Sequence, residues 1–492
     1  MRKIIESQMK IGEVDISEIK FDLRSRDEIP KLLMGLQYIY CTPAVKNKVF
    51  EILEKIVPAE VNSKVGRQGM NLWNILVFGT LRLNCNWDYD KVQEMANNHM
   101  TLRQMLGIGI TNMEYKFPLQ TLRDNVCLLT PEILAEINRE VVKAGHNLVK
   151  KKEEKLKGRC DSFVVETDGH YPTDINLLFD AIRKVVTILA ASCAQKSISD
   201  WRQHRYLLKK VKRLFRRAQN IKASKSKDEK KIAAREKLVV ESYQAYMSYV
   251  ETLLVNAAKT LEKLKGASVL AAVHSIEVEK FIAHAKRQID QIERRVMNGE
   301  KIPNAEKVFS LFEEYTEWIC KGKAGISQEL GLKVCVLEDQ YGFILNHQVM
   351  QKQTDEQVAI SIIKETKEIF PDLSLCSFDK GFYSAENKRG LAEILEKVIL
   401  PKKGKLSQAD KEIEHSEEFI KSKRKHSAVE SGINALENHG LDRCLDQGIV
   451  GFKRYVSLAV AARNIQILGN IIQQKKQEKL RKANKKYLKK AA

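Results

Sequence analysis

The residue pattern changes at Cys160, and this change limits the folds that the chain can adopt. Between residues 15 and 150 apolar residues recur at the spacing of one helix face, as in the series Leu72, Ile75, Leu76 and Leu83. From Asp161 to Asp168 the pattern becomes that of a strand rich in β-branched residues. An all-helical region is therefore followed by a region that contains strands.

The order of strands and helices after this change predicts a mixed α/β fold. A strand is expected first, then helices from 175 to about 297, and then strands and helices alternate to residue 400. The later strands are expected at 315–320, 332–337, 342–349, 373–378 and 397–400, and the later helices at 355–369 and 385–395. Without the long helical part, this is the element order of an RNase H-like domain.

We therefore predict a helix-rich α/β protein of three parts. Residues 1–150 form an all-α region, and residues 151–470 form an RNase H-like domain. A basic helical insert, residues 183–305, separates the first two strands of that domain, and residues 471–492 form a basic C-terminal tail.

The charge of the chain indicates a polyanionic partner. There are 84 Lys and Arg against 63 Asp and Glu, which gives a net charge of +21. Between Lys196 and Lys237 there are 16 basic and 4 acidic residues, and between Lys475 and Lys490 nine basic and one acidic. A solvated helix face is the alternative for the first stretch, but its charge excess favours contact with phosphates.

Three short helices are expected in tandem between Asn71 and Leu106. Such an arrangement suits helix-turn-helix recognition of DNA, and it suits a plain helical bundle equally well. If DNA ends are recognised by their bases, this segment is the best candidate, because phosphate contacts carry no sequence information.

The cellular location is expected to be the cytoplasm. No apolar run approaches the roughly 18 residues of a membrane span, since the longest, from Val185 to Ala194, is interrupted by Thr187 and Ser192. The nine cysteines are scattered without a Cys-x-x-Cys pair, which is typical of a reducing compartment. We expect no membrane partner.

Three acids occur where two-metal phosphodiester chemistry needs them. Such chemistry uses carboxylates that hold two divalent ions roughly 4 Å apart. Asp161 opens the first strand, Asp379 follows the apolar strand 373–378, and Glu430 flanks the expected buried stripe of Val429, Ile433 and Leu436. For the first acid, Asp168 and Asp174 are alternatives, although Asp174 is a natural cap for the helix that follows.

The chain also resembles bacterial insertion-sequence transposases of the DDE type, near the unclassified (ISNCY-like) group. Residues 66 to 106 resemble the N-terminal helical domain of these proteins. The blocks CDSFVVETDGHYPTDINLL, LEDQYGFIL, FDKGFYS, HSAVESGINALENHGLDRC and GFKRYVSLAVAARNIQILG resemble successive parts of their catalytic domain. The resemblance extends over residues 60 to 470, and we accordingly expect residues 1–150 to be a DNA-binding region and residues 151–470 to be the catalytic domain.

The resemblance implies an RNase H-like fold and a metal-dependent enzyme. It implies two Mg²⁺ ions, which Mn²⁺ can replace, held by Asp161, Asp379 and Glu430 as catalytic residues. It also implies cleavage of double-stranded DNA at terminal inverted repeats and strand transfer into target DNA, by a homodimer or larger assembly on DNA. The alternative is a catalytically inactive DNA-binding protein derived from a transposase.

One motif of related families is not kept in this sequence. Those families have Tyr, Arg and Lys seven before, four before and seven after the final Glu, where this chain has Lys423, His426 and Glu437. The cation that would grip the DNA is therefore left open, with the substitutes Arg424, Arg443 and Lys453. The segment 321–325, rich in Lys and Gly, lacks the frame of a phosphate-binding loop.

Overall fold

The computed structural model describes residues 2–5, 9, 11–58, 69–221, 228–264, 269–320 and 328–491. The chain folds into two compact units, one formed by residues 1–168 and 317–492 and the other by residues 169–316. The turn predicted at 321–323 and the first residues of the segment 66–106 lie outside the described residues.

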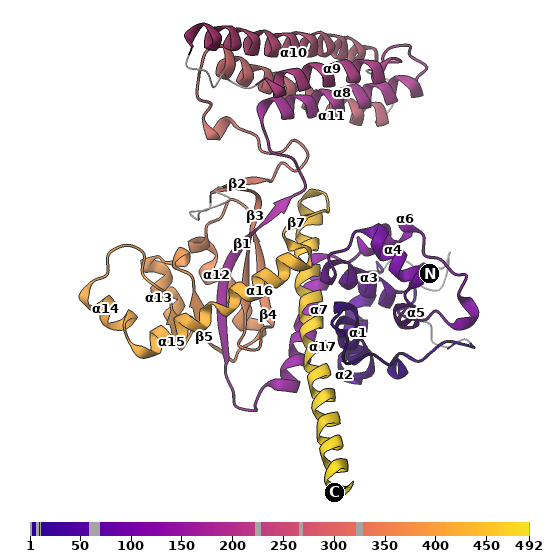
Figure 1. Cartoon of the computed structure of the whole chain (residues 1–492), viewed down its shortest axis with the longest axis vertical. Helices are drawn as coiled ribbons and strands as arrows, with labels where there is room; N and C mark the ends of the chain where they lie inside the picture. The colour runs from indigo at the N-terminus through magenta and orange to yellow at the C-terminus, as the bar shows by residue number, and fades with distance from the viewer. Residues whose placement is uncertain are drawn as a thin grey trace. The chain divides into compact units, whose positions relative to one another are not determined.

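In the described residues, the first unit contains one mixed sheet of seven strands (Figure 1). The strands β4, β3, β1, β5 and β6 are neighbours in that order. Two short strands complete the sheet, because β2 pairs with β3 and β7 pairs with β1. The pairs β4–β3 and β3–β1 are antiparallel, whereas β1–β5 and β5–β6 are parallel. The strands are β1 (Leu156–Thr167), β2 (Glu317–Cys320), β3 (Gln328–Glu338), β4 (Ile344–Met350), β5 (Leu373–Phe378), β6 (Lys397–Ile399) and β7 (Arg443–Cys444).

The strand predictions after residue 314 are confirmed to within a few residues, and β5 matches its predicted range. The first strand differs, because β1 begins at Leu156 rather than at Asp161. The early residues of β1 pair with β5, and the side chain of Leu156 is fully buried in the core beside the sheet. The expectation that Asp161 opens the strand is therefore wrong, since Asp161 lies in its middle.

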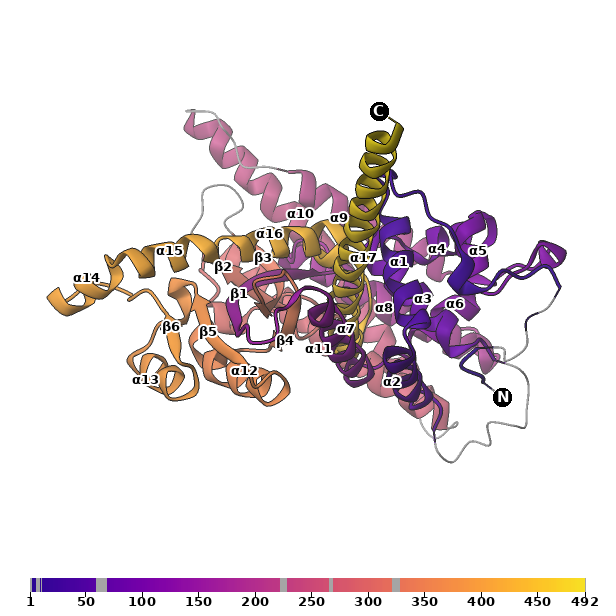
Figure 2. The ribbon, with the colours of Figure 1, turned by 90° about the horizontal axis from the view of Figure 1, so that it is seen from below.

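Helices cover both faces of this sheet, as Figure 2 shows for α12 and α13 on one side and α15 and α16 on the other. The first pair buries its apolar residues against Cys160, Cys335 and Cys376 of the sheet. Successive side chains of a strand point to opposite faces, so Asp161 belongs to the face of α16. The helices are α12 (Asp355–Ile369), α13 (Ala385–Ile394), α14 (Gln408–Glu414), α15 (Glu417–His426) and α16 (Ala428–Leu436).

The helical region before residue 150 packs around the long C-terminal helix α17 (Gly448–Ala491). Gly35 and Gly469 let α1 and α17 cross closely, because a side chain at either glycine would collide with backbone of the other helix. The tail from 471 continues this helix rather than forming a separate arm. The other helices are α1 (Glu28–Cys41), α2 (Pro43–Glu54), α3 (Leu72–Asn84), α4 (Tyr89–Asn98), α5 (Met100–Met105), α6 (Leu119–Val126) and α7 (Pro131–Val149).

The three tandem helices predicted between Asn71 and Leu106 are present as α3, α4 and α5. All residues of α3 are buried, so this helix is part of the core and presents no side chain to a partner. Within the described residues, one helix is long and apolar enough to cross a membrane, in the stretch Gly448–Asn484, and 78% of its apolar window is buried inside the protein.

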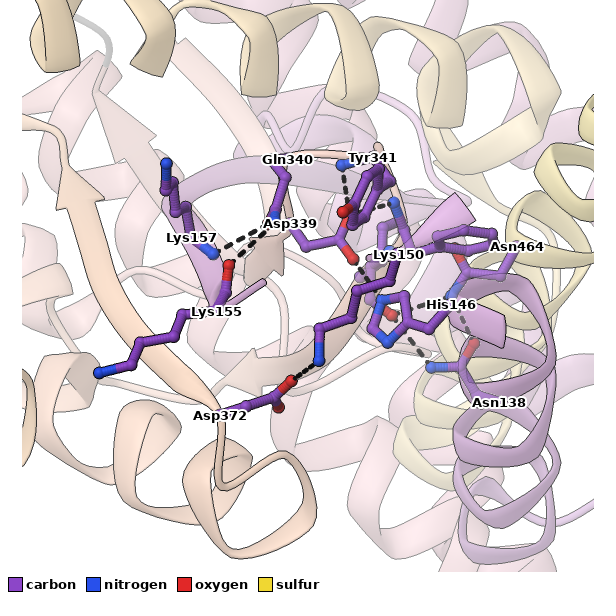
Figure 3. A network of polar contacts seen from close by, with 12 residues as sticks. Asn138, His146, Lys150, Lys155, Lys157, Asp339, Gln340, Tyr341, Asp372 and Asn464 are labelled. Carbon is purple, nitrogen blue, oxygen red and sulfur yellow. Dashed lines mark hydrogen bonds and ion pairs between the residues drawn. The ribbon is translucent and has the colours of Figure 1, made fainter. Parts of the chain in front are cut away.

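A buried polar network joins the helical region to the sheet within the first unit (Figure 3). His146 of α7 lies with Nε2 2.6 Å from Oδ2 of Asp339, whose side chain is inaccessible to solvent. The other carboxylate oxygen of Asp339 accepts hydrogen bonds from the backbone N–H groups of Tyr341 and Phe343. Asn464 of α17 donates to the carbonyl oxygen of Ile344 and accepts from its N–H. The predicted boundaries at 150 and 470 stay predictions.

The second unit is a helical bundle that the chain enters after β1 and leaves before β2. Its core includes Ile182, Val186, Tyr246, Val250 and Phe281. It extends beyond the predicted insert 183–305 at both ends, because the first helix already begins at Asp174 and buries its apolar side here. The helices are α8 (Asp174–Gln195), α9 (His204–Asn220), α10 (Glu229–Leu264) and α11 (Val269–Ile292).

Candidate functional site

The pairing of β1 with β5 brings two of the predicted acids together. Cys160 is the parallel partner of Phe378, and Asp161 and Asp379 are the next residues of the two chain segments. The pKa of Asp161 is raised to about 6, chiefly by burial, and the negative charges of Asp379, Asp355 and Glu430 contribute to this rise. Asp161 is therefore electrostatically coupled to the other two predicted acids and to one that was not predicted.

Asp379 lies at the carboxyl end of β5 and is exposed to solvent. Its backbone begins a short 3₁₀ turn, Lys380–Phe382, and its Oδ2 accepts a hydrogen bond of 3.4 Å from the N–H of Gly381. Ser384 then caps α13 by accepting a hydrogen bond from the N–H of Asn387. The carboxylate is thus held at the carboxyl end of β5, where it is open to a ligand.

Glu430 lies on α16, and the helix buries the stripe of Val429, Ile433 and Leu436, which confirms the predicted pattern. The helix approaches the sheet through Gly432, because a side chain there would collide with the carboxylate of Glu338. This close approach leaves Glu430 exposed on the face of the sheet that carries Asp161.

Asp355 is a fourth acid that the sequence interpretation treated only as the start of a helix. It is the first residue of α12, and its carboxylate accepts a hydrogen bond of 2.6 Å from the hydroxyl of Ser162 and pairs with Lys333 at 2.9 Å. A Cβ placed on Gly381 would lie 3.1 Å from Oδ2 of Asp355 and 3.7 Å from Oδ2 of Asp379. No sequence signal singles out Asp355, because acids are ordinary in the first turn of a helix.

His426, at the end of α15, extends this group of side chains. Its Nδ1 lies 3.0 Å from the hydroxyl oxygen of Ser377, and its Nε2 is buried with no hydrogen-bond partner among the described residues. Burial lowers the pKa of His426, while the charges of Asp379 and Glu430 oppose that shift. A neutral imidazole beside these carboxylates can donate or accept a proton.

Cations surround a pocket beside Asp379. Lys380, Lys402 and Lys423 line it together with Glu414, and Lys402 is also paired with Asp410 at 2.5 Å. Lys423 occupies the position seven residues before Glu430. These lysines can bind a phosphate group next to the acids.

The alternative cations are less well situated for contact with a ligand at Asp379. Arg424 lines a neighbouring pocket, and Arg443 is an ion-pair partner of Asp168, at 3.8 Å. Lys453 is on α17, where its charge acts on Glu132. Glu437 begins a π-helical turn after α16 and supplies no cation.

The alternatives for the first acid lie elsewhere. Asp168 follows Asp161 by seven residues of extended chain, roughly 23 Å at the rise of a strand, and the charges that act on Asp161 come from Asp379, Asp355 and Glu430. Asp174 was expected to cap α8, but Thr173 is the cap, and Asp174 pairs with Arg295 inside the second unit.

The donor set fits a divalent metal in its chemistry, because carboxylate oxygens are the ligands that Mg²⁺ prefers. Repulsion from neighbouring acids adds to the effect of burial on the pKa of Asp161, and a bound cation would relieve that repulsion. As the side chains stand, no group of three or more His, Cys, Asp and Glu in the described part of the chain is close enough to hold a metal ion.

No family model, no curated protein and no solved structure matches the chain.

Proposed function

We propose that this protein is a metal-dependent DNA transposase with an RNase H-like catalytic domain, in which Asp161, Asp379 and Glu430 are the catalytic acids. The proposal is supported by the order and directions of the strands β4, β3, β1, β5 and β6. It is carried by one observation, the parallel register of β1 and β5, which makes Asp161 and Asp379 the residues that follow a paired Cys160 and Phe378, while α16 with Glu430 packs against β1.

The reaction consists of two phosphoryl transfers at one site. In the first, a water oxygen attacks a phosphorus atom at the end of the element, and the bond to the 3′ oxygen breaks to leave a free 3′ hydroxyl and a 5′ phosphate. In the second, that hydroxyl attacks a phosphorus atom of target DNA and displaces a second 3′ oxygen. Two Mg²⁺ ions, when bound, would activate the attacking oxygen and stabilise the leaving oxygen.

The residues of the chain contribute binding, orientation and proton transfer. Asp161, Asp379 and Glu430 would hold the two cations, and Asp379 and Glu430 are exposed to an incoming DNA strand, whereas Asp161 is half-buried. Lys380 and Lys423 would hold the phosphate of that strand in the pocket at Asp379. His426 is well situated to accept or donate the proton that each transfer moves.

The proposal is tested by incubating the full chain with Mg²⁺ and labelled DNA that carries candidate element ends, and reading strand cleavage on a denaturing gel. Wild-type protein should cut at the ends, and Asp379→Asn should lose at least a hundredfold in rate while its affinity for DNA stays within about twofold. Glu386→Gln, an exposed acid of the neighbouring helix α13, is the matched control and should cut at the wild-type rate.

Two other results would overturn the proposal. Binding of the ends without cleavage under any divalent ion would indicate a DNA-binding protein derived from a transposase. Cleavage of all DNA sequences at equal rates, with no strand transfer, would indicate a sequence-tolerant nuclease.

A further inference from the structure

Helix α9 of the second unit has two faces of opposite character. Its apolar residues are buried or half-buried in the bundle core, where Phe215 stacks on Phe179 of α8 with the ring centroids 4.9 Å apart. The residues on this side are Leu207, Leu208, Val211, Leu214, Phe215 and Ala218. At 3.6 residues per turn they lie within about 120° of the helix circumference.

The opposite face of α9 is made of cations, and we call it the α9 basic face. At the same helical spacing its members fall within an arc of about 140°, and all of them are exposed. The α9 basic face consists of Arg205, Lys209, Lys212, Arg213, Arg216 and Arg217. The helix contains no acidic residue.

None of these six cations forms an ion pair within the described residues of the chain, whereas many cations of the other helices in this unit do. Lys184 pairs with Glu277 and Lys263 with Asp200. Arg294 contacts three acids at distances of 2.6 to 3.4 Å. The α9 basic face is therefore a concentration of positive charge that the described residues leave without ion-pair partners.

Lys210 does not belong to this face, although it lies within the basic stretch of the sequence. Its Nζ lies 4.2 Å from the centroid of the Tyr249 ring of α10, and the residue is only half-exposed. Lys210 therefore contributes to packing between α9 and α10 through a cation–π contact.

We propose that the α9 basic face binds the phosphate backbone of double-stranded DNA without regard to base sequence. From Arg205 to Arg217 the face extends for roughly 18 Å, and B-DNA carries about one phosphate charge per 1.7 Å of its axis, so a row of cations meets a row of anions. The inference rests on the proposed function for the identity of the polyanion.

A membrane surface is less suited to the same face. Amphipathic helices that bind membranes insert their apolar side into the lipid, and the apolar side of α9 is occupied by the bundle core. Apart from the aliphatic parts of the cations, the exposed apolar surface beside this face comes from Tyr206, a single side chain that is 63% exposed.

The test measures how the affinity for DNA depends on salt, with the full chain, no divalent ion and a 30-base-pair duplex of unrelated sequence. In the variant K209Q/K212Q/R213Q/R216Q the slope of log K against log salt should become shallower by about 3 to 4, because about 0.9 counterion is released for each phosphate contact. The substituted side chains are exposed and unpaired, so thermal unfolding should match that of wild type.

Two further variants separate the face from total charge and from the fold. K230Q/K259Q/K286Q/R287Q removes four exposed cations from α10 and α11 and should keep the wild-type slope to within about one. K209R/K212R/R213K/R216K keeps the charge of the face and should also keep the slope. The inference would be overturned if K209Q/K212Q/R213Q/R216Q and K230Q/K259Q/K286Q/R287Q had equal salt slopes.

Binding to other polyanions and the cleavage assay complete the test. Vesicles of phosphatidylserine and phosphatidylcholine, or duplex RNA, bound through this face more tightly than DNA would also overturn the inference. If the wild type fails to cleave element ends but the α9 variant has the shallower salt slope, the proposed function is wrong and the inference about α9 stands. If the wild type cleaves element ends but the α9 variant keeps the wild-type slope, the inference about α9 alone is wrong.

Discussion

Cys160 and Phe378 are parallel partners in neighbouring strands, and each is followed by an aspartate. The register of β1 against β5 thus determines which acid of the first strand can act together with Asp379. Shifting β1 by one residue would move the Asp161 side chain to the other face of the sheet, because successive side chains alternate.

This relationship predicts which substitutions in β1 affect DNA cleavage. Asp161→Asn should lower the cleavage rate at least a hundredfold, as is also expected for Asp379→Asn, because both residues belong to one group of interacting carboxylates. Asp168→Asn should leave the rate within about threefold of wild type, because Asp168 lies seven residues after Asp161 in the chain and pairs with Arg443. Initial rates on labelled element ends measure both. Loss of cleavage in the Asp168 variant alone would transfer the role of first acid to Asp168.

The elements around this group could be predicted because their signals are local. The apolar run Leu373–Phe378 defines β5, and the apolar stripe of α16 follows from helical spacing. The start of β1 could not be predicted in this way, because it is set by pairing with β5 more than 200 residues later in the sequence. Asp355 likewise enters the site only through its contacts with Ser162 and Lys333.

The raised pKa of Asp161 predicts how stability changes with pH when no divalent ion is present. Its pKa is about 6 in the folded protein and about 3.9 in the unfolded chain. Between these values the folded state keeps a proton that the unfolded state has released, so the free energy of unfolding falls as pH rises from 4 to 6. The charged side chain therefore destabilises the fold at neutral pH.

Asp161→Asn removes this penalty and should be more stable than wild type at pH 7.5 in EDTA, by about 1 to 2 kcal/mol after allowance for partial exposure. At pH 4 the advantage should nearly vanish. Thermal unfolding followed by circular dichroism measures both values, and Mg²⁺ should raise the midpoint of wild type more than that of the variant. A variant less stable than wild type at pH 7.5 in EDTA, with the same response to Mg²⁺, would contradict this account.

The network in Figure 3 predicts a large loss of stability at Asp339. Asp339→Ala should lower the free energy of unfolding by about 3 to 5 kcal/mol, because it removes the acceptor of two backbone N–H groups and the partner of His146 from a buried site. Asp372→Ala is the control, since Asp372 pairs with Lys150 at a partly exposed position and should cost less than about 1 kcal/mol. Urea unfolding compares them, and similar midpoints for the two variants would refute the prediction.

If the protein recognises DNA ends, it must contact their bases. The structure limits which residues of the predicted segment 71–106 are available for such contacts. Helix α3 is excluded because all of its residues are buried. The next helix, α4, presents a stripe of exposed polar side chains, Lys91, Glu94 and Asn98. The helices of residues 1–150 pack against α17, so the test uses the full-length chain.

We therefore expect the full-length variant K91A/E94A/N98A to lose at least tenfold of its preference for element ends over scrambled duplexes, as base contacts contribute about 1 to 3 kcal/mol each. Its salt dependence should stay near that of wild type, because only one cation is removed. N47A/K48A/E51A removes the same three residue types from exposed positions on α2 and should keep the preference. Competition binding with both duplexes decides the matter. If the α4 variant keeps its preference, the bases are read elsewhere, and α3 to α5 form a helical bundle without a role in base recognition.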